Sequence, residues 1–404
     1  MELMISPAHQ RVRDRVKRAT RIDLFPTPAV QSAFLAGQTA GDPTAERFVA
    51  ETYHGAMGGE KAGALLDEAL RVGIDNVPDA PDSMRALFAE FETIPDWLDA
   101  DLIEQGAAVW RRWGYNLGAV GNAGTMDTYT EGSLAVPLSL SGGYAGASAL
   151  NRYLETSRWW LEVCKPGAVL TPGSRAREVS LKVRVMHVSV RARVAAHPEW
   201  NAQAHGLPIS QSEMLLTLLG GSVGPAFGLT ALGFLTSPAE VRAVLHFNRY
   251  LGHLVGCSVD DMYPQSYADG LRLLYYFDAT RKHDSGDLGP ELVESFVPSF
   301  RPPAGVRGRA RLRGLFHLHL QAGYTRLFML PWNRRRYRLP SGIPGLMILI
   351  GRAPLIAVVE VLRRAVPGVD ERWQAGQMRR WRRWHAWHLG QREEKFDATK
   401  ALRR

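Results

Sequence analysis

Cysteine is scarce in this chain of 404 residues, and Cys164 and Cys257 form no Cys-x-x-Cys pair. A disulfide framework is therefore excluded, and a reducing compartment is favoured. The N-terminal stretch 1–25 carries charges throughout and lacks the apolar run of a secretory signal. From these two absences we expect a cytoplasmic protein.

Nucleotide-binding motifs are also absent. No Gly-x-Gly-x-x-Gly sequence follows a predicted strand, and there is no Gly-x-x-x-x-Gly-Lys loop, so dinucleotide-dependent and P-loop enzymes are disfavoured. Strict alternation of apolar and polar residues is rare, whereas apolar residues recur at spacings of three and four. Ser210 and Glu213 have the spacing of a capping box that opens a helix. The pattern predicts an all-α protein built as a helical bundle.

Direct metal-binding patterns are weak. Glu51 and His54 have the Glu-x-x-His spacing of a di-iron site, but a di-iron bundle needs two such pairs and further glutamates. His317 and His319 could chelate a metal in a strand, but their helical surroundings place the two rings on different faces. Neither pair predicts a metal centre of this kind.

Positive charge is in excess, with a net charge of +9 and arginines concentrated beyond residue 300. The stretch 343–362 is long and apolar enough to suggest a membrane span, but Arg352 and Pro354 lie at its centre. A charge at the centre of a span costs about 2.5–3.5 kcal/mol on insertion scales. We therefore expect a buried helical hairpin or an interfacial helix here, and not a span.

Tryptophans and arginines are mixed near the C-terminus. They are Trp373, Arg379, Arg380, Trp381, Arg382, Arg383, Trp384 and Trp387. The favoured interpretation is a helix that packs its tryptophans on the rest of the protein and turns its arginines to water. The second alternative is a helix that makes peripheral contact with a membrane. No nucleic-acid-binding motif accompanies the arginines, so we expect no nucleic-acid partner.

Composition divides the chain into four predicted parts: a lead-in over 1–41, a helical domain over 42–280, a linker rich in Asp, Gly and Pro over 281–304, and a basic helical region over 305–404. Within the second part, an amphipathic helix is predicted over 100–117, followed by a Gly- and Thr-rich loop around 121–130. Two strongly periodic helices are predicted over 148–163 and 178–196.

The helix predicted over 178–196 carries a histidine on its apolar face. His187 shares one stripe with Val183, Met186, Val190 and Val194. Arg184 and Arg191 flank it. A neutral imidazole in an apolar pocket beside guanidinium groups suits a proximal haem ligand, because iron takes a ring nitrogen while arginine can pair with the propionates. The alternative, which the spacing alone favours, is a core histidine hydrogen-bonded to a backbone carbonyl.

Two segments carry a resemblance to a known family. Arg152-Tyr-Leu-Glu-Thr156 is followed, one helix later, by Val183-Arg-Val-Met-His-Val-Ser-Val-Arg191. The blocks Leu-Pro-Ile-Ser-Gln-Ser-Glu at 207–213 and Asn-Arg-Tyr-Leu-Gly-His-Leu-Val-Gly from residue 248, ending in Tyr-Pro at 263–264, belong to the same pattern. Over roughly residues 42–265 the chain resembles the rubber oxygenase (latex-clearing protein) and mycophenolic-pathway oxygenase family.

The resemblance implies a globin-like helical core that binds one haem b, with His187 as the iron ligand. It also implies that Arg152 and Thr156 act at the distal side, where their spacing of four places both side chains on one helix face. The implied activity is oxidation or cleavage of an apolar, unsaturated small molecule by dioxygen. The alternative for this pair is a surface arginine and a threonine that bonds back to a carbonyl of its own helix.

One position departs from the family pattern. Where rubber oxygenases have a lysine that can bind the iron, this chain has Glu155. The glutamate that the family uses as a base has no placed counterpart, since Glu131 is merely nearby in sequence and 136–140 is largely apolar. We therefore expect a substrate smaller than polyisoprene. A non-catalytic protein that binds haem or an apolar ligand is the alternative.

Overall fold

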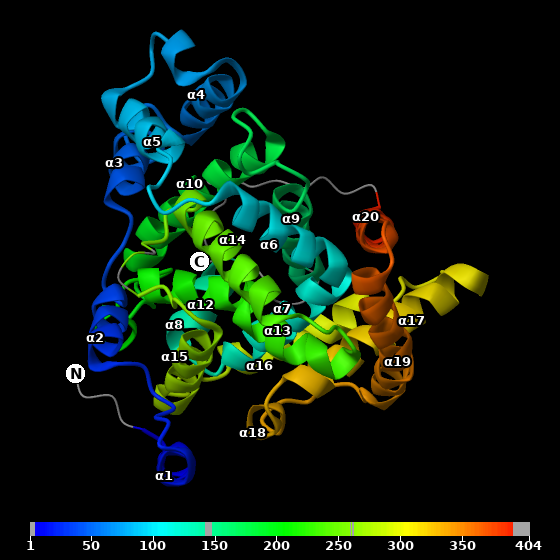
Figure 1. Ribbon diagram of the computed structural model, residues 1–404. Coiled ribbons are helices and arrows are strands. Elements are labelled where there is room, and N and C mark those ends of the chain that lie inside the picture. The colour runs from blue at the N-terminus through cyan, green and yellow to red at the C-terminus, as the bar shows by residue number, and fades with distance from the viewer. Residues whose placement is uncertain (1–4, 142–147, 259, 261, 391–404) are drawn as a thin grey trace.

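The computed structural model describes residues 5–141, 148–258, 260 and 262–390, and within these residues it consists of helices and loops without strands. The α-helices are α1 (Pro7–Thr20), α2 (Pro28–Gly37), α3 (Pro43–Glu51), α4 (Gly59–Val72), α5 (Asp82–Glu92), α6 (Ala100–Trp113), α7 (Tyr115–Thr128), α8 (Gly132–Leu140), α9 (Ser148–Val163), α10 (Arg175–Ala195), α11 (Ala202–His205), α12 (Gln211–Gly221), α13 (Val223–Gly228), α14 (Pro238–Leu254), α15 (Tyr267–Thr280), α16 (Leu288–Phe296), α17 (Gly308–Phe328), α18 (Pro331–Arg334), α19 (Ile343–Ala365) and α20 (Val369–Leu389). The 3-10 helices are η1 (Ile74–Asn76), η2 (Leu229–Leu232) and η3 (Val297–Phe300). The predicted all-helical fold is confirmed (Figure 1).

The packing of α6 against α14 lies at the centre of the bundle. Gly106 on α6 is so close to α14 that a Cβ atom there would lie 2.3 Å from the carbonyl oxygen of Ala243. One turn further along α6, the buried Trp110 meets Phe247 edge-on, with ring centroids 5.1 Å apart. The indole nitrogen of Trp110 donates to the carbonyl of Gly221 at 2.9 Å, so its one polar atom is satisfied. A small residue thus permits the close approach, and a large one fills the space beside it.

Capping boxes fix the start of α12 and α14. The backbone N–H of Ser210 donates to the Glu213 carboxylate at 3.0 Å, and the Ser210 hydroxyl accepts from the Glu213 backbone N–H. Ser237 and Glu240 make the same reciprocal pair at α14. Each pair satisfies two backbone donors that a helix start leaves without partners. The capping box predicted at residue 210 is confirmed.

The loop predicted around 121–130 is wrong, because α7 continues as a helix to Thr128. Two glycines of α7, Gly118 and Gly121, face neighbouring helices closely, whereas Gly124 is exposed with no atom near its Cβ position. A Cβ at Gly118 would lie 2.7 Å from the Trp160 ring, and Gly121 faces the Gly220 carbonyl. Tertiary packing therefore overrides the low helix propensity of glycine.

The segment 281–304, predicted as a linker, contains α16 and η3. Leu292 and Phe300 are buried in the same hydrophobic core as the helices before and after them. Tyr153 of α9 meets Phe296 edge-on, with ring centroids 5.4 Å apart. The segment is thus packed into the core, and the proposed domain boundaries remain a prediction.

Three C-terminal helices, α17, α19 and α20, pack together along one side of the molecule (Figure 1). The predicted helical hairpin is wrong, since α19 is one continuous helix with Pro354 inside it. Two stretches are long and apolar enough to cross a membrane, Gln211–Leu232 and Ile343–Ala365. The first is 61% buried inside the protein, whereas the second is only 22% buried.

The tryptophans of α20 pack inward, as the favoured interpretation expects. Trp381 is 1% exposed and its indole nitrogen donates to the Ser157 hydroxyl of α9 at 2.9 Å. Trp384 is also buried, and Arg382 and Arg383 beside them are exposed. Residues 391–404, the end of the predicted basic region, lie outside the described residues.

Candidate functional site

The candidate site lies on two neighbouring helices, α9 and α10, both predicted from their periodicity. Helix α9 has the predicted bounds, while α10 begins three residues before the predicted start, where Ser174 caps it by accepting from the Arg177 backbone N–H. Trp159 of α9 donates to the Ser180 hydroxyl of α10 at 3.0 Å. The two helices are therefore held in contact, which brings the residues of both motifs into one region.

His187 is partly buried on α10, and its Nδ1 atom is buried without a hydrogen-bond partner among the described residues. Burial, with the positive charges of Arg191 and Arg152, lowers the pKa of His187 to about 4. The imidazole is therefore neutral at physiological pH, with a lone pair available to a metal. The alternative interpretation, a core histidine bonded to a backbone carbonyl, does not describe this side chain.

Arg152 and Thr156 lie one turn apart on α9, as their spacing requires. A guanidinium N–H of Arg152 donates to the Glu155 carboxylate at 3.1 Å. The Thr156 hydroxyl donates to the Arg152 carbonyl at 3.1 Å, the backbone bond that the alternative interpretation foresaw. Arg152 nonetheless lies close enough to His187 to lower its pKa. Residues 142–147, directly before α9, lie outside the described residues.

Arg184, predicted to bind the cofactor, forms a buried ion pair within the protein. Its side chain is 1% exposed and donates two hydrogen bonds to the Asp42 carboxylate, at 2.7 and 2.8 Å, and one to Glu90 at 2.5 Å. This fork-to-fork pair joins α10 to the start of α3 and to α5. In this structure the guanidinium is thus paired with carboxylates of the protein, and its predicted role in cofactor binding remains a prediction.

Arg191 is also engaged within the protein. It donates to the Glu46 carboxylate at 3.0 Å and to the carbonyl oxygen of Ile209 at 2.6 Å. The predicted role of Arg191 in cofactor binding likewise remains a prediction. The sequence showed which residues were charged but not where their carboxylate partners were, because Glu46 is 145 positions away.

A cavity of about 280 Å³ lies between α3 and α10, on the face of α10 beside the His187 stripe. Its lining is mostly apolar and consists of Glu46, Val49, Ala50, His54, Val188, Arg191, Ala192, Ala195 and Leu207. His54, treated as part of a chance motif in the sequence, points its Nε2 at the Ser189 hydroxyl of α10, 3.1 Å away. Sequence spacing gave no signal for this contact, since 135 residues separate the pair.

Two buried carboxyl groups lie near the start of α8. Burial raises the pKa of Glu213 to about 7 and also raises the pKa of Glu131. Glu131, the nearest candidate for the family's base, accepts the backbone N–H of Lys282 at 2.7 Å. It therefore anchors the chain after α15, and the structure assigns it no contact with His187.

The donor set fits a prosthetic group that brings its own metal ligands. No cluster of three or more His, Cys, Asp or Glu side chains able to hold a metal occurs in the part of the chain that the structure describes. His187 offers one neutral nitrogen, with Val183 and Val190 beside it on an apolar stripe. Haem needs only such an axial nitrogen from the protein, so His187 fits the role of its ligand.

Comparison with known proteins places these features in context. Residues 107–388 match the model of the catalytic domain described as ER-bound oxygenase mpaB/B′/rubber oxygenase. The match includes the Arg152–Thr156 and His187 motifs and continues through the predicted linker. The fold is similar to the solved structure of latex clearing protein in the closed state, with a TM-score of 0.61 and 18% identity over 85% of this chain and 90% of that one. No curated protein matches the sequence.

Proposed function

The chain belongs to the family of the ER-bound oxygenase mpaB/B′ and rubber oxygenase catalytic domains, and on this premise we propose that it is a haem b-dependent oxygenase. Its substrates are dioxygen and an apolar, unsaturated small molecule. The enzyme acts in the cytoplasm. Haem b, when bound, supplies the iron at which dioxygen is activated.

The observation that carries the proposal is the buried, unpartnered Nδ1 of His187. A buried polar atom without a partner costs about 1–3 kcal/mol, so its persistence at a motif position calls for a partner that is not a protein group. The pKa of about 4 keeps the imidazole neutral at physiological pH, so one of its two ring nitrogens carries a free lone pair. An iron ion is the partner that a neutral imidazole takes most readily in this family.

The other residues of the site act on His187 and on its surroundings. Arg152 holds a positive charge near His187, which disfavours protonation of the imidazole, and Glu155 holds Arg152 in place. Val183 and Val190 flank the histidine and limit access of water to it.

The proposal is tested by producing the protein with a haem precursor and measuring its absorption spectrum and dioxygen uptake. We expect a Soret band, one haem b per chain, and dioxygen consumption that increases when short unsaturated hydrocarbons are added. Protein that binds haem but consumes no dioxygen with any such compound would be a haem-binding protein and not an oxygenase. Protein without haem would refute the proposal altogether.

Replacing Glu155 with lysine is expected to shift the Soret band. An amine at this position can reach the iron if α9 forms the distal wall, whereas the natural carboxylate is a poorer ligand. The matched control is Glu155→Gln, which also breaks the contact with Arg152 but supplies no amine. Equal spectra for both variants would mean that residue 155 does not face the iron.

A further inference from the structure

Helix α19 exposes a row of apolar side chains to solvent. Its solvent-facing side, called here the outer face of α19, carries large apolar side chains that are 44–70% exposed: Ile343, Met347, Ile350, Leu355, Val358, Val361 and Leu362. Single exposed apolar residues are ordinary on protein surfaces, but a continuous row along a helix is not. The stretch has a mean hydropathy of 2.0, and only 22% of it is buried within the protein.

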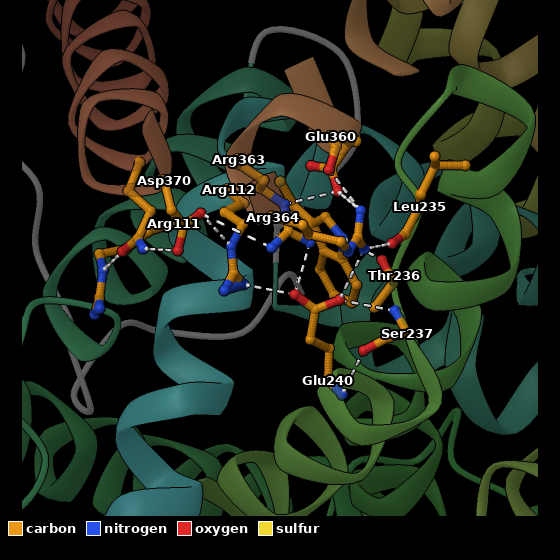
Figure 2. A network of polar contacts seen from close by, with 12 residues as sticks. Arg111, Arg112, Leu235, Thr236, Ser237, Glu240, Glu360, Arg363, Arg364 and Asp370 are labelled. Carbon is orange, nitrogen blue, oxygen red and sulfur yellow. Dashed lines mark hydrogen bonds and ion pairs between the residues drawn. The ribbon is translucent and has the colours of Figure 1, made fainter. Parts of the chain in front are cut away.

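Glu360 and Arg363 of α19 instead point toward Glu240 of α14 (Figure 2), whereas the side chain of Arg364 is 37% exposed. Glu360 is 2% exposed and accepts from Arg363 at 2.9 Å, and Arg363 also donates to Glu240 of α14 at 2.6 Å. Arg112 of α6 joins the same network through Asp370, at 2.7 Å. At its other end, Arg352 contacts the Asn116 side chain and the Tyr324 hydroxyl.

This arrangement has a physical cost in water. Burying charged groups carries a desolvation penalty that ion pairing only partly offsets, while the exposed apolar row gains nothing from facing solvent. A helix with its charges turned inward and its apolar side outward is stable where the outer medium is apolar. Water is therefore not the medium that this face is suited to.

The surrounding charge indicates what that medium is. The two helices packed against α19 present exposed arginines that form no ion pair with a described residue: Arg309, Arg311, Arg379, Arg382 and Arg383. The helices α17 and α20 that carry these arginines pack against α19, so the exposed apolar face belongs to a basic region of the protein. An apolar face in a basic region complements an anionic lipid surface, whose acyl chains contact apolar side chains and whose phosphates pair with arginines. A second copy of this basic chain would bring like charges together.

A full membrane span is excluded by the packing of the inner side. Helix α19 lies against α17, η2 and α20, and a Cβ at Gly345 would lie 1.8 Å from the His319 carbonyl oxygen. Arg352 of α19 donates to Asn116 of α7, and Arg363 of α19 donates to Glu240 of α14. Insertion across a bilayer would have to break these contacts.

We propose that the outer face of α19 lies in the interfacial layer of an anionic membrane and holds the protein at the lipid surface. This differs from the contact through α20 considered from the sequence, because the tryptophans Trp381 and Trp384 of α20 are buried. The attachment is independent of the proposed oxygenase activity.

The test is co-sedimentation of the full chain with phosphatidylcholine vesicles that either contain or lack phosphatidylglycerol. We expect wild-type protein to bind the anionic vesicles and the double variant Leu355→Glu/Val358→Glu to bind at least about tenfold more weakly, since two carboxylates oppose insertion of the face. The matched control is Val12→Glu/Ile94→Glu, whose native side chains are 48% and 71% exposed elsewhere on the surface. It is expected to bind like wild type.

Each other outcome overturns the proposal. If wild-type protein stays in the supernatant, the protein has no lipid-binding face. If wild type and both double variants bind equally, the lipid-binding surface is not the outer face of α19. A dimer in sedimentation velocity that the α19 variant abolishes, without vesicle binding, assigns the face to a second copy of the chain. Circular dichroism and thermal melting verify that both variants fold, and folding is expected because all four positions are exposed.

Discussion

Replacing His187 with alanine is expected to abolish haem retention and, with it, dioxygen consumption. In the proposed site the ring nitrogen of His187 is the iron ligand, and alanine offers no ligand atom in its place. Purified His187→Ala should contain less than about a tenth of the wild-type haem, because loss of a ligand costs more than the 10–100-fold typical of outer-shell partners. The measurement is haem content per chain from the Soret band, after production under identical conditions.

A matched control separates loss of a ligand from local damage. His54→Ala removes another histidine that contacts α10, through its 3.1 Å interaction with Ser189. It should leave the Soret band in place. If His187→Ala keeps the wild-type spectrum, another residue binds the iron and the assignment of His187 is wrong. If both variants lose haem together with their melting transition, the cause is unfolding, and His187→Phe, which fills the space without a ligand atom, decides between the two.

Replacing Arg184 with methionine is expected to lower the free energy of unfolding by about 3–5 kcal/mol, the range for removing one partner of a buried ion pair. Arg184 is 1% exposed and Asp42, its bidentate partner, is 5% exposed, so the variant leaves a buried carboxylate without its cation. Urea unfolding followed by circular dichroism measures the change.

The double variant Arg184→Met/Asp42→Asn is the control, since it also removes the Asp42 charge that the single variant leaves buried and unpaired. We expect it to recover a large part of the lost stability, because the penalty arises from the unpaired charge more than from the lost contact. The haem content of folded Arg184→Met should equal that of wild type. Normal stability with reduced haem would instead support the propionate-binding role inferred from the sequence.

Local pattern was sufficient to predict much of the fold. Helix periodicity predicted α9 at its observed bounds, and the capping box at Ser210 predicted the start of α12. These features depend on residues within one or two turns, which the sequence displays directly. The same reasoning failed at 121–130, because α7 continues to Thr128 and packs Gly121 against the Gly220 carbonyl of α12.

The candidate site was predictable in part. The stripe that holds His187 and the four-residue spacing of Arg152 and Thr156 are properties of single helices, and both are present in the structure. The carboxylate partners of Arg184 and Arg191 were not predictable, because they are far away in the sequence. Asp42 and Glu90 precede Arg184 by 142 and 94 positions. Glu46 precedes Arg191 by 145 positions. The sequence does not distinguish an arginine near His187 that binds a ligand from one that forms a buried ion pair with a distant carboxylate.

The sequence by itself determined that the chain is helical, which helices carry the two motifs, and that His187 lies on an apolar stripe. Only the tertiary structure decided that the Nδ1 of His187 has no hydrogen-bond partner among the described residues, that Arg184 is bound to Asp42, and that α19 turns Glu360 inward and Leu355 outward. The physical reason is that helix formation depends on neighbours within a few residues. Burial and ion pairing depend instead on which distant segments pack against a face, and that is settled only when the whole chain folds.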